Sequence, residues 1–237
     1  ADRQTYGPGT SAYIKIPKIG FLMGNESFLS FNVLYSATLG QNAVLNSDGA
    51  YSLIRGIEVS HGTEQLVSQS TDAGRAWTAM RDFSANNTPG ASIGLGCLAA
   101  DSSQGHVITN NNTYSYAFCL PVSLLGSLST VSTPMGWLQG GDMTLKVTFS
   151  DFASAVYITA GTAATTAGSF TVSNVEYHAK VSQLDSSVEN GLRAAYGGKP
   201  VVIPSTEISM QSGVAPAAIS SVNQQISLPY SSCKGVA

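Results

Sequence analysis

Charged side chains are scarce in this sequence of 237 residues. It holds 11 Lys and Arg and 14 Asp and Glu, or 11% of the chain, whereas about a quarter is usual in soluble domains. The formal net charge is −3, and Lys and Arg form no run. Because nucleic-acid binding needs a basic patch that neutralises phosphates, we expect no direct contact with nucleic acid. A neutral, polar surface repels its own copies little, which favours an assembling subunit.

Cysteine is equally sparse. Cys97, Cys119 and Cys233 lie far apart among apolar or small residues, and no CxxC pair occurs. This spacing suggests neither a zinc site nor a redox motif, so we expect buried free thiols and no metal or cofactor. No apolar stretch approaches the length that spans a bilayer, so we expect no membrane span.

Strand-length runs of alternating apolar and polar residues are the main positive signal. Apolar residues make up 43% of the chain, enough for a sizeable core. Turn-forming residues such as those at 46–49, 86–90, 110–112 and 140–142 separate the runs, which predicts an all-β sandwich or barrel. The alternation is visible in residues 29–35, 57–59, 114–120, 145–149, 175–181 and 226–230. We expect Phe31, Val33, Phe118 and Val147 to point into the core.

Two helices are predicted between these strands. Residues 72–83 place apolar side chains on one side. Residues 186–196 begin with a possible capping box of Ser186 and Glu189, carry Val188 and Leu192 at helical spacing, and are followed by two glycines. We expect this second helix to fill the open end of the barrel.

Catalytic patterns are weak. The segment 90–94 matches the GxSxG pattern around Ser92, but glycines follow where a nucleophile elbow needs a helix. His61, His106 and His178 are isolated in the sequence, with no carboxylate or second His at ligand spacing. We therefore expect no enzyme activity and assign no catalytic, cofactor-binding or metal-binding residue, with a Ser92 hydrolase as a rival hypothesis.

The two tryptophans leave another rival hypothesis open. Trp77 and Trp137 could form a platform for stacking sugars, as in a carbohydrate-binding jelly-roll module. Trp77 belongs to a helical pattern, which favours a packed side chain. Trp137 lies in a predicted loop, so its sequence context does not indicate whether its side chain is packed or exposed.

The order of these pieces resembles the first, N-terminal jelly roll of the double jelly-roll major capsid proteins of tailless icosahedral DNA viruses. The closest match is the stretch 117–126, AFCLPVSLLG. The other matching segments are 13–17, 26–31, 53–59, 143–149, 172–177 and 228–236. The resemblance implies an eight-stranded antiparallel jelly roll with sheets B-I-D-G and C-H-E-F. It also implies a structural role in the virion: homotrimeric, pseudo-hexameric capsomers, in contact with neighbouring capsid proteins, form an icosahedral shell inside the host cell.

One departure from the family concerns the end of the chain. If residues 228–236 are the penultimate strand H, then strand I is absent, and strands B and D both have unpaired edges. We therefore expect residues 1–237 to be a single domain, the N-terminal barrel of a longer chain, with the closing strand supplied from beyond residue 237 or by another chain. The long loops 86–112 and 205–223 are candidates for contacts between subunits.

Overall fold

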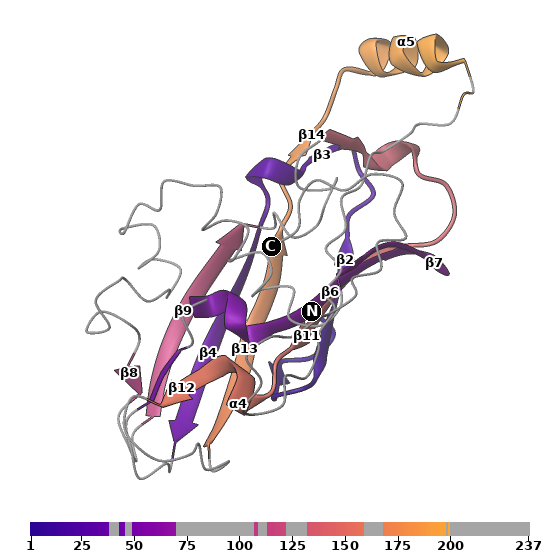
Figure 1. The fold of residues 1–237 in the computed structure, drawn as a ribbon. Coiled ribbons are helices and arrows are strands. Elements are labelled where there is room, and N and C mark those ends of the chain that lie inside the picture. The colour runs from indigo at the N-terminus through magenta and orange to yellow at the C-terminus, as the bar shows by residue number, and fades with distance from the viewer. Residues whose placement is uncertain are drawn as a thin grey trace, which may run out of the picture.

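A computed structural model describes residues 1–37, 43–45, 49–69, 107–108, 113–121, 132–158, 168–197 and 199. Most of the strands in these residues belong to two four-stranded antiparallel sheets (Figure 1). One sheet has the order β1 (Thr5–Tyr6), β13 (Gly168–His178), β4 (Phe28–Ala37) and β9 (Thr113–Pro121). The other has the order β2 (Ser11–Ile16), β11 (Met143–Phe149), β6 (Ile54–His61) and β7 (Glu64–Gln69).

The path of the chain through these sheets defines the fold. Lettered B to I along the chain, the eight strands are β1, β2, β4, β6, β7, β9, β11 and β13. The first sheet then has the order B-I-D-G and the second C-H-E-F. The fold is an eight-stranded jelly roll, and the predicted strand order is confirmed.

The core lies between the two sheets and follows from the alternation in the sequence. Alternate residues of β4 and β11 are buried, so each strand contributes one apolar face. Rings from both sheets meet there: the ring centroids of Phe31 in β4 and Phe149 in β11 lie 6.1 Å apart, and Tyr6 in β1 lies 5.9 Å from Phe149. The four predicted core residues, Phe31, Val33, Phe118 and Val147, are all at most 4% exposed.

The prediction that strand I is missing is wrong. β13 lies between β1 and β4 and pairs with both, through Thr5↔Ser173 and Tyr6↔Val172 on one side and through most of β4 on the other. The error arose because β1 has only two residues, which is too short to show alternation. Without β1 the count of strands is one short, and the segment 172–177, which belongs to strand I, is not recognised as the closing strand.

Short elements cover the two ends of the barrel (Figure 1). At one end β10 (Ser132–Pro134), β3 (Phe21–Met23) and β14 (Val181–Ser182) form a small sheet. At the other end β12 (Val156–Ile158), β5 (Ala43–Leu45) and β8 (Val107–Ile108) form another. The short helices are η1 (Gly24–Glu26), η2 (Gly49–Leu53), η5 (Met135–Trp137) and α4 (Phe152–Ala155).

The helix predicted over 186–196 is confirmed as α5 (Ser186–Tyr196), but two details were wrong. The cap is Asp185, whose carboxylate accepts a hydrogen bond from the Ser187 amide, instead of a Ser186–Glu189 capping box. Moreover, α5 does not fill the barrel. It has no buried residue and lies beyond β14, away from both large sheets (Figure 1).

The remaining predictions have mixed outcomes. The alternating runs at 29–35, 57–59, 114–120 and 145–149 all lie in strands. The run at 175–181 is divided, because β13 ends at His178 and Val181 belongs to β14. The predicted helix 72–83 and the predicted strand 226–230 lie outside the described residues. Among the described residues, no helix is long and apolar enough to cross a membrane.

Candidate functional site

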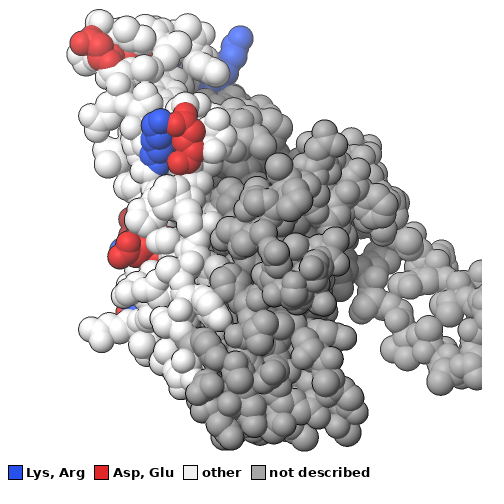
Figure 2. All heavy atoms as spheres, turned by 90° about the vertical axis from the view of Figure 1, so that its left-hand side faces the viewer, with Lys and Arg blue, Asp and Glu red and all other residues white. Residues whose placement is uncertain are grey.

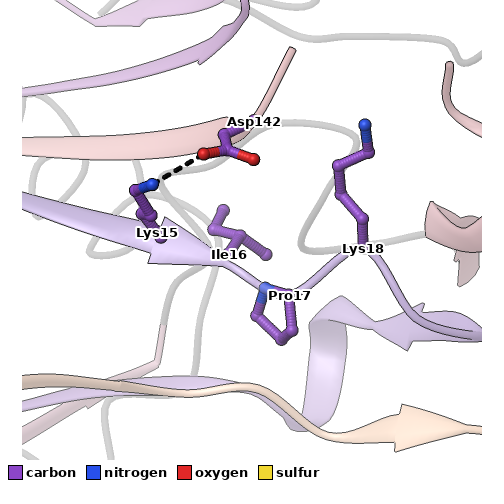
Figure 3. A pocket seen from close by; sticks show the side chains of 5 residues that line it. All are labelled: Lys15, Ile16, Pro17, Lys18 and Asp142. Carbon is purple, nitrogen blue, oxygen red and sulfur yellow. Dashed lines mark hydrogen bonds and ion pairs between the residues drawn. The ribbon is translucent and has the colours of Figure 1, made fainter. Parts of the chain in front are cut away.

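A shallow hollow lies where β2 ends and β11 begins, lined by Lys15, Ile16, Pro17, Lys18 and Asp142 (Figure 3). Lys15 Nζ donates a hydrogen bond to Asp142 Oδ2 at 2.7 Å. This bond and the charge attraction lower the pKa of Asp142 and raise the pKa of Lys15. Lys18 Nζ donates to the carbonyl oxygens of Gly140 and Gly141, each at 2.9 Å. Both ammonium groups are therefore engaged within the chain, and the two lysines together hold the turn before β11 in place.

The same turn explains the place of His61 at the end of β6. Its ring lies beside Gly140, and its Nε2 is buried with no hydrogen-bond partner among the described residues. Gly62 and Gly141 approach so closely that a Cβ on Gly141 would lie 2.6 Å from the Gly62 Cα. His61 also pairs in register with Glu64 of β7, and the contact of its ring with Gly140 is one of packing.

His178 at the end of β13 is not isolated, contrary to the expectation from the sequence. Its Nε2 lies 2.8 Å from Ser30 Oγ and 3.5 Å from Glu176 Oε2, and its ring stacks on Phe28 with centroids 4.5 Å apart. Ser, His and Glu together suggest a catalytic triad, but a triad needs the acid on the opposite ring nitrogen from the serine. Here both partners contact Nε2, so the imidazole cannot relay a proton from serine while the acid orients it.

Trp137 in η5 connects the barrel to α5. Its Nε1 donates to Glu189 Oε1 at 3.0 Å, and its ring packs edge-on against Phe21 and Tyr196, each with a centroid distance of 5.6 Å. The Arg193 guanidinium lies 5.7 Å from the ring centroid. Trp137 is therefore half-buried and engaged by its own chain, which favours a role in attaching α5 over one in stacking a sugar.

The sequence did not reveal this junction. Glu189 and Arg193 have the i,i+4 spacing of a helical ion pair, and their side chains do meet at 3.0 Å. Their shared partner Trp137 lies about fifty residues earlier in the chain, and only the fold brings it beside them. The helical spacing of Val188 and Leu192 predicts an apolar face that is buried at the end of the barrel, but the structure differs. They are 51% and 37% exposed.

The other candidate residues give little chemistry. Ser92, His106, Trp77, Cys97 and Cys233 lie outside the described residues, as does the loop 205–223. The loop 86–112 lies outside them as well, apart from Val107–Ile108, which form strand β8 instead of a loop. Cys119 is a free thiol on β9, exposed instead of buried as expected, and desolvation raises its pKa. Within the described ranges, no group of three His, Cys, Asp or Glu side chains is arranged to hold a metal ion.

The described surface carries few charges. On the face in Figure 2, most of the described atoms belong to uncharged residues, and the acidic and basic groups are few and scattered. Several of the charged groups are paired, for example Lys180 with Glu26 and Lys146 with Glu58. This face therefore offers mainly uncharged groups for contact.

Comparison with known proteins gives similarities among solved structures. The STIV MCP, from Sulfolobus Turreted Icosahedral Virus, matches 80% of this chain with 15% identity and a TM-score of 0.46. The capsid of the PBCV-1 virus matches 80% with 15% identity and a TM-score of 0.46, and PBCV-1 VP54, fitted into a reconstruction of the virophage Sputnik, matches 79% with 16% identity and a TM-score of 0.43. The chain spans 50%, 43% and 43% of those chains. No family model and no curated protein matches this sequence.

Proposed function

We propose that this chain is a structural protein of a virus capsid and has no catalytic role. The observation that carries the proposal is the B-I-D-G and C-H-E-F topology, built from segments whose order in the sequence resembles the double jelly-roll capsid proteins. Five of the resembling segments overlap β2, β4, β6, β11 and β13, and a sixth overlaps β9. A charge-poor surface supports the same role, because neutral faces pack against copies of themselves without long-range repulsion.

In this proposal the described barrel is the N-terminal one of a longer chain, and the assembly unit is a homotrimer with a pseudo-hexagonal outline. Copies of this chain and neighbouring capsid proteins are the partners. The protein is assembled inside the host cell and ends in the virion shell. Its eight barrel strands lie within residues 5–178, so α5 lies outside the barrel and is available for joining it to something else.

The test is the state of assembly of the complete polypeptide as its source makes it. Purified protein is examined by analytical ultracentrifugation and negative-stain electron microscopy. Trimers with a hexagonal outline, or closed shells, are the expected result. A monomer at all accessible concentrations would contradict the proposal. If such a monomer also bound glycans on an array, the carbohydrate-binding alternative would replace it.

A further inference from the structure

We infer that the hollow between β2 and β11 binds an oxyanion, a carboxylate or phosphate group, through the ammonium groups of Lys18 and Lys15. The inference goes beyond the proposed function. The hollow has a volume of about 370 Å³, which is ample for such a group, and two lysines but a single carboxylate line it. Figure 3 shows the Lys15–Asp142 pair at one side of the hollow and Lys18 at the other, with Ile16 and Pro17 between them.

Lys18 carries a positive charge that no described carboxylate pairs with. Lys15, Lys146 and Lys180 each form an ion pair with an acidic side chain, whereas Lys18 forms none with a described residue. Its ammonium group instead donates to the carbonyl oxygens of residues 140 and 141, each at 2.9 Å. Carbonyl dipoles hold the ammonium group in position but leave its full charge, and one of its three N–H groups remains for a ligand.

The turn that holds this ammonium group is closely packed. Gly140 has a φ of +90°, and a Cβ on Gly141 would lie 2.6 Å from the Gly62 Cα. The Gly62 amide also donates to the Asp142 carbonyl oxygen at 3.0 Å. Pro17 restricts the backbone between the two lysines, because its ring fixes φ. An anion would therefore meet a donor that is already in place, so little further ordering opposes binding.

The remaining donors favour an anion with at least two oxygens. Lys15 uses one N–H on Asp142 Oδ2 at 2.7 Å, so two N–H groups remain on Lys15 and one on Lys18. A cation would be repelled by both ammonium groups. The buried side chain of Ile16 lines the hollow, and its low polarity strengthens the attraction for an anion. A free phosphate and an acidic side chain of a neighbouring copy carry the same chemistry, so the experiment has to separate these two sources.

Acetylation of lysines, followed by mass spectrometry of peptides, tests the site in the complete protein in any state of assembly. Inorganic phosphate should slow the acetylation of Lys15 and Lys18 several-fold relative to chloride of equal ionic strength, because a bound oxyanion covers their ammonium groups. Half of the effect is expected at millimolar concentration, and acetate should act in the same way at higher concentration. Lys146 and Lys180 are internal controls, because each already has a carboxylate partner outside the hollow.

A charge variant provides an independent readout. Lys18→Gln keeps an N–H donor for the turn but loses the charge, so the protection of Lys15 should require about tenfold more phosphate, as expected for one lost hydrogen bond to a charged group. Lys146→Gln removes a lysine from the same sheet and should leave the protection unchanged. The footprint of the unaltered protein stands without either variant.

The outcomes separate the site, the source of the anion and the proposed function. Equal slowing at all four lysines, or equal slowing by chloride, would show charge screening and overturn the site, as would protection of Lys15 that Lys18→Gln leaves unchanged. Protection of Lys18 in capsomers or shells without added phosphate, lost on dissociation, would identify a neighbouring acidic side chain as the source. Protection that needs added phosphate would identify the free anion. A monomer with phosphate-protected lysines would support the site and reject the proposed function.

Discussion

At the scale of single residues, Gly20 shows how closely the elements pack at the end of the barrel that carries β3 and β14. It has a φ of +54°, and an added Cβ would collide with the Ser182 carbonyl oxygen in β14. Its own carbonyl oxygen accepts the Gly136 amide at 3.1 Å, next to Trp137. One glycine thus allows β14 and η5 to approach the link between β2 and β3, where a side chain would separate them.

Replacing Gly20 with Ala is therefore expected to destabilise the protein. The left-handed backbone alone costs about 1–2 kcal/mol for a residue with a Cβ, and the collision with Ser182 adds to this cost. Gly7→Ala is the matched control, because its Cβ would meet nothing within 4 Å, and its effect should stay within about 0.5 kcal/mol. Urea unfolding of both variants measures the difference. Equal midpoints for the two variants would show that the close approach is not needed.

At the scale of elements, the sequence predicted the strands whose apolar residues alternate and missed the elements that lack such a pattern. β4 and β11 alternate over many residues, so their existence and inward faces could be read directly. β1 has two residues, and its strand character comes from pairing with β13 instead of from its own pattern. The bulge in β13 between Ser173 and Glu176, where Asn174 has a φ of +51°, likewise has no local signal.

The position of α5 was unpredictable for a related reason. Its capped, amphipathic pattern predicted a helix, but an amphipathic helix needs a partner that the pattern does not name. Its partner proved to be Trp137, which contacts Glu189 and Tyr196, while Val188 and Leu192 stay exposed. The sequence therefore predicted the helix but not which of its sides is attached to the barrel.

The attachment of α5 to η5 gives a prediction at this scale. A helix of eleven residues is marginal by itself, so the contacts of Trp137 should supply much of its order. Trp137→Ala is expected to raise amide hydrogen exchange across 186–196 by about tenfold or more, and to leave the exchange of β4 and β11 nearly unchanged. Mass spectrometry of peptides from the exchanged protein separates the two regions.

Two controls define the cause. Trp137→Phe keeps a ring against Phe21 and Tyr196 but loses the bond to Glu189, so its exchange should lie between that of the parent and that of the Ala variant. Leu192→Ala removes an exposed side chain from the same helix and should leave the attachment intact. If Trp137→Ala left the exchange of α5 unchanged, the helix would be ordered without its contact to the barrel.

At the scale of the whole molecule, closure of the barrel depends on how its shortest strand is held. β1 covers only two positions of β13, so side chains must secure the segment before β2. Asp2 does so: its Oδ1 accepts the Tyr6 hydroxyl and the Tyr13 amide, each at 2.8 Å. The carboxylate therefore joins the buried ring of Tyr6 in β1 to β2 in the facing sheet. This contact between the two sheets depends on the ionisation of Asp2.

This arrangement predicts a loss of stability in acid. Desolvation tends to raise the pKa of Asp2, but hydrogen bonds from Tyr13 and Tyr6 and the charge of Arg3 outweigh it and hold the pKa below its ordinary 3.8. Because the folded-state pKa is the lower one, the stabilisation is fully present above the unfolded pKa and is lost as pH falls through the folded pKa. The free energy of unfolding should therefore decline below about pH 4.

Asp2→Asn, which cannot titrate, should flatten part of that decline, as urea unfolding from pH 6 to pH 2 would measure. Asp142→Asn removes another lowered pKa but leaves β1 untouched. The protection of the Tyr6 and Val172 amides, taken relative to the intrinsic exchange rate at each pH, should therefore lose its acid dependence only in Asp2→Asn. Acid-dependent exchange at those two amides in Asp2→Asn as well would mean that other groups control the closing strand.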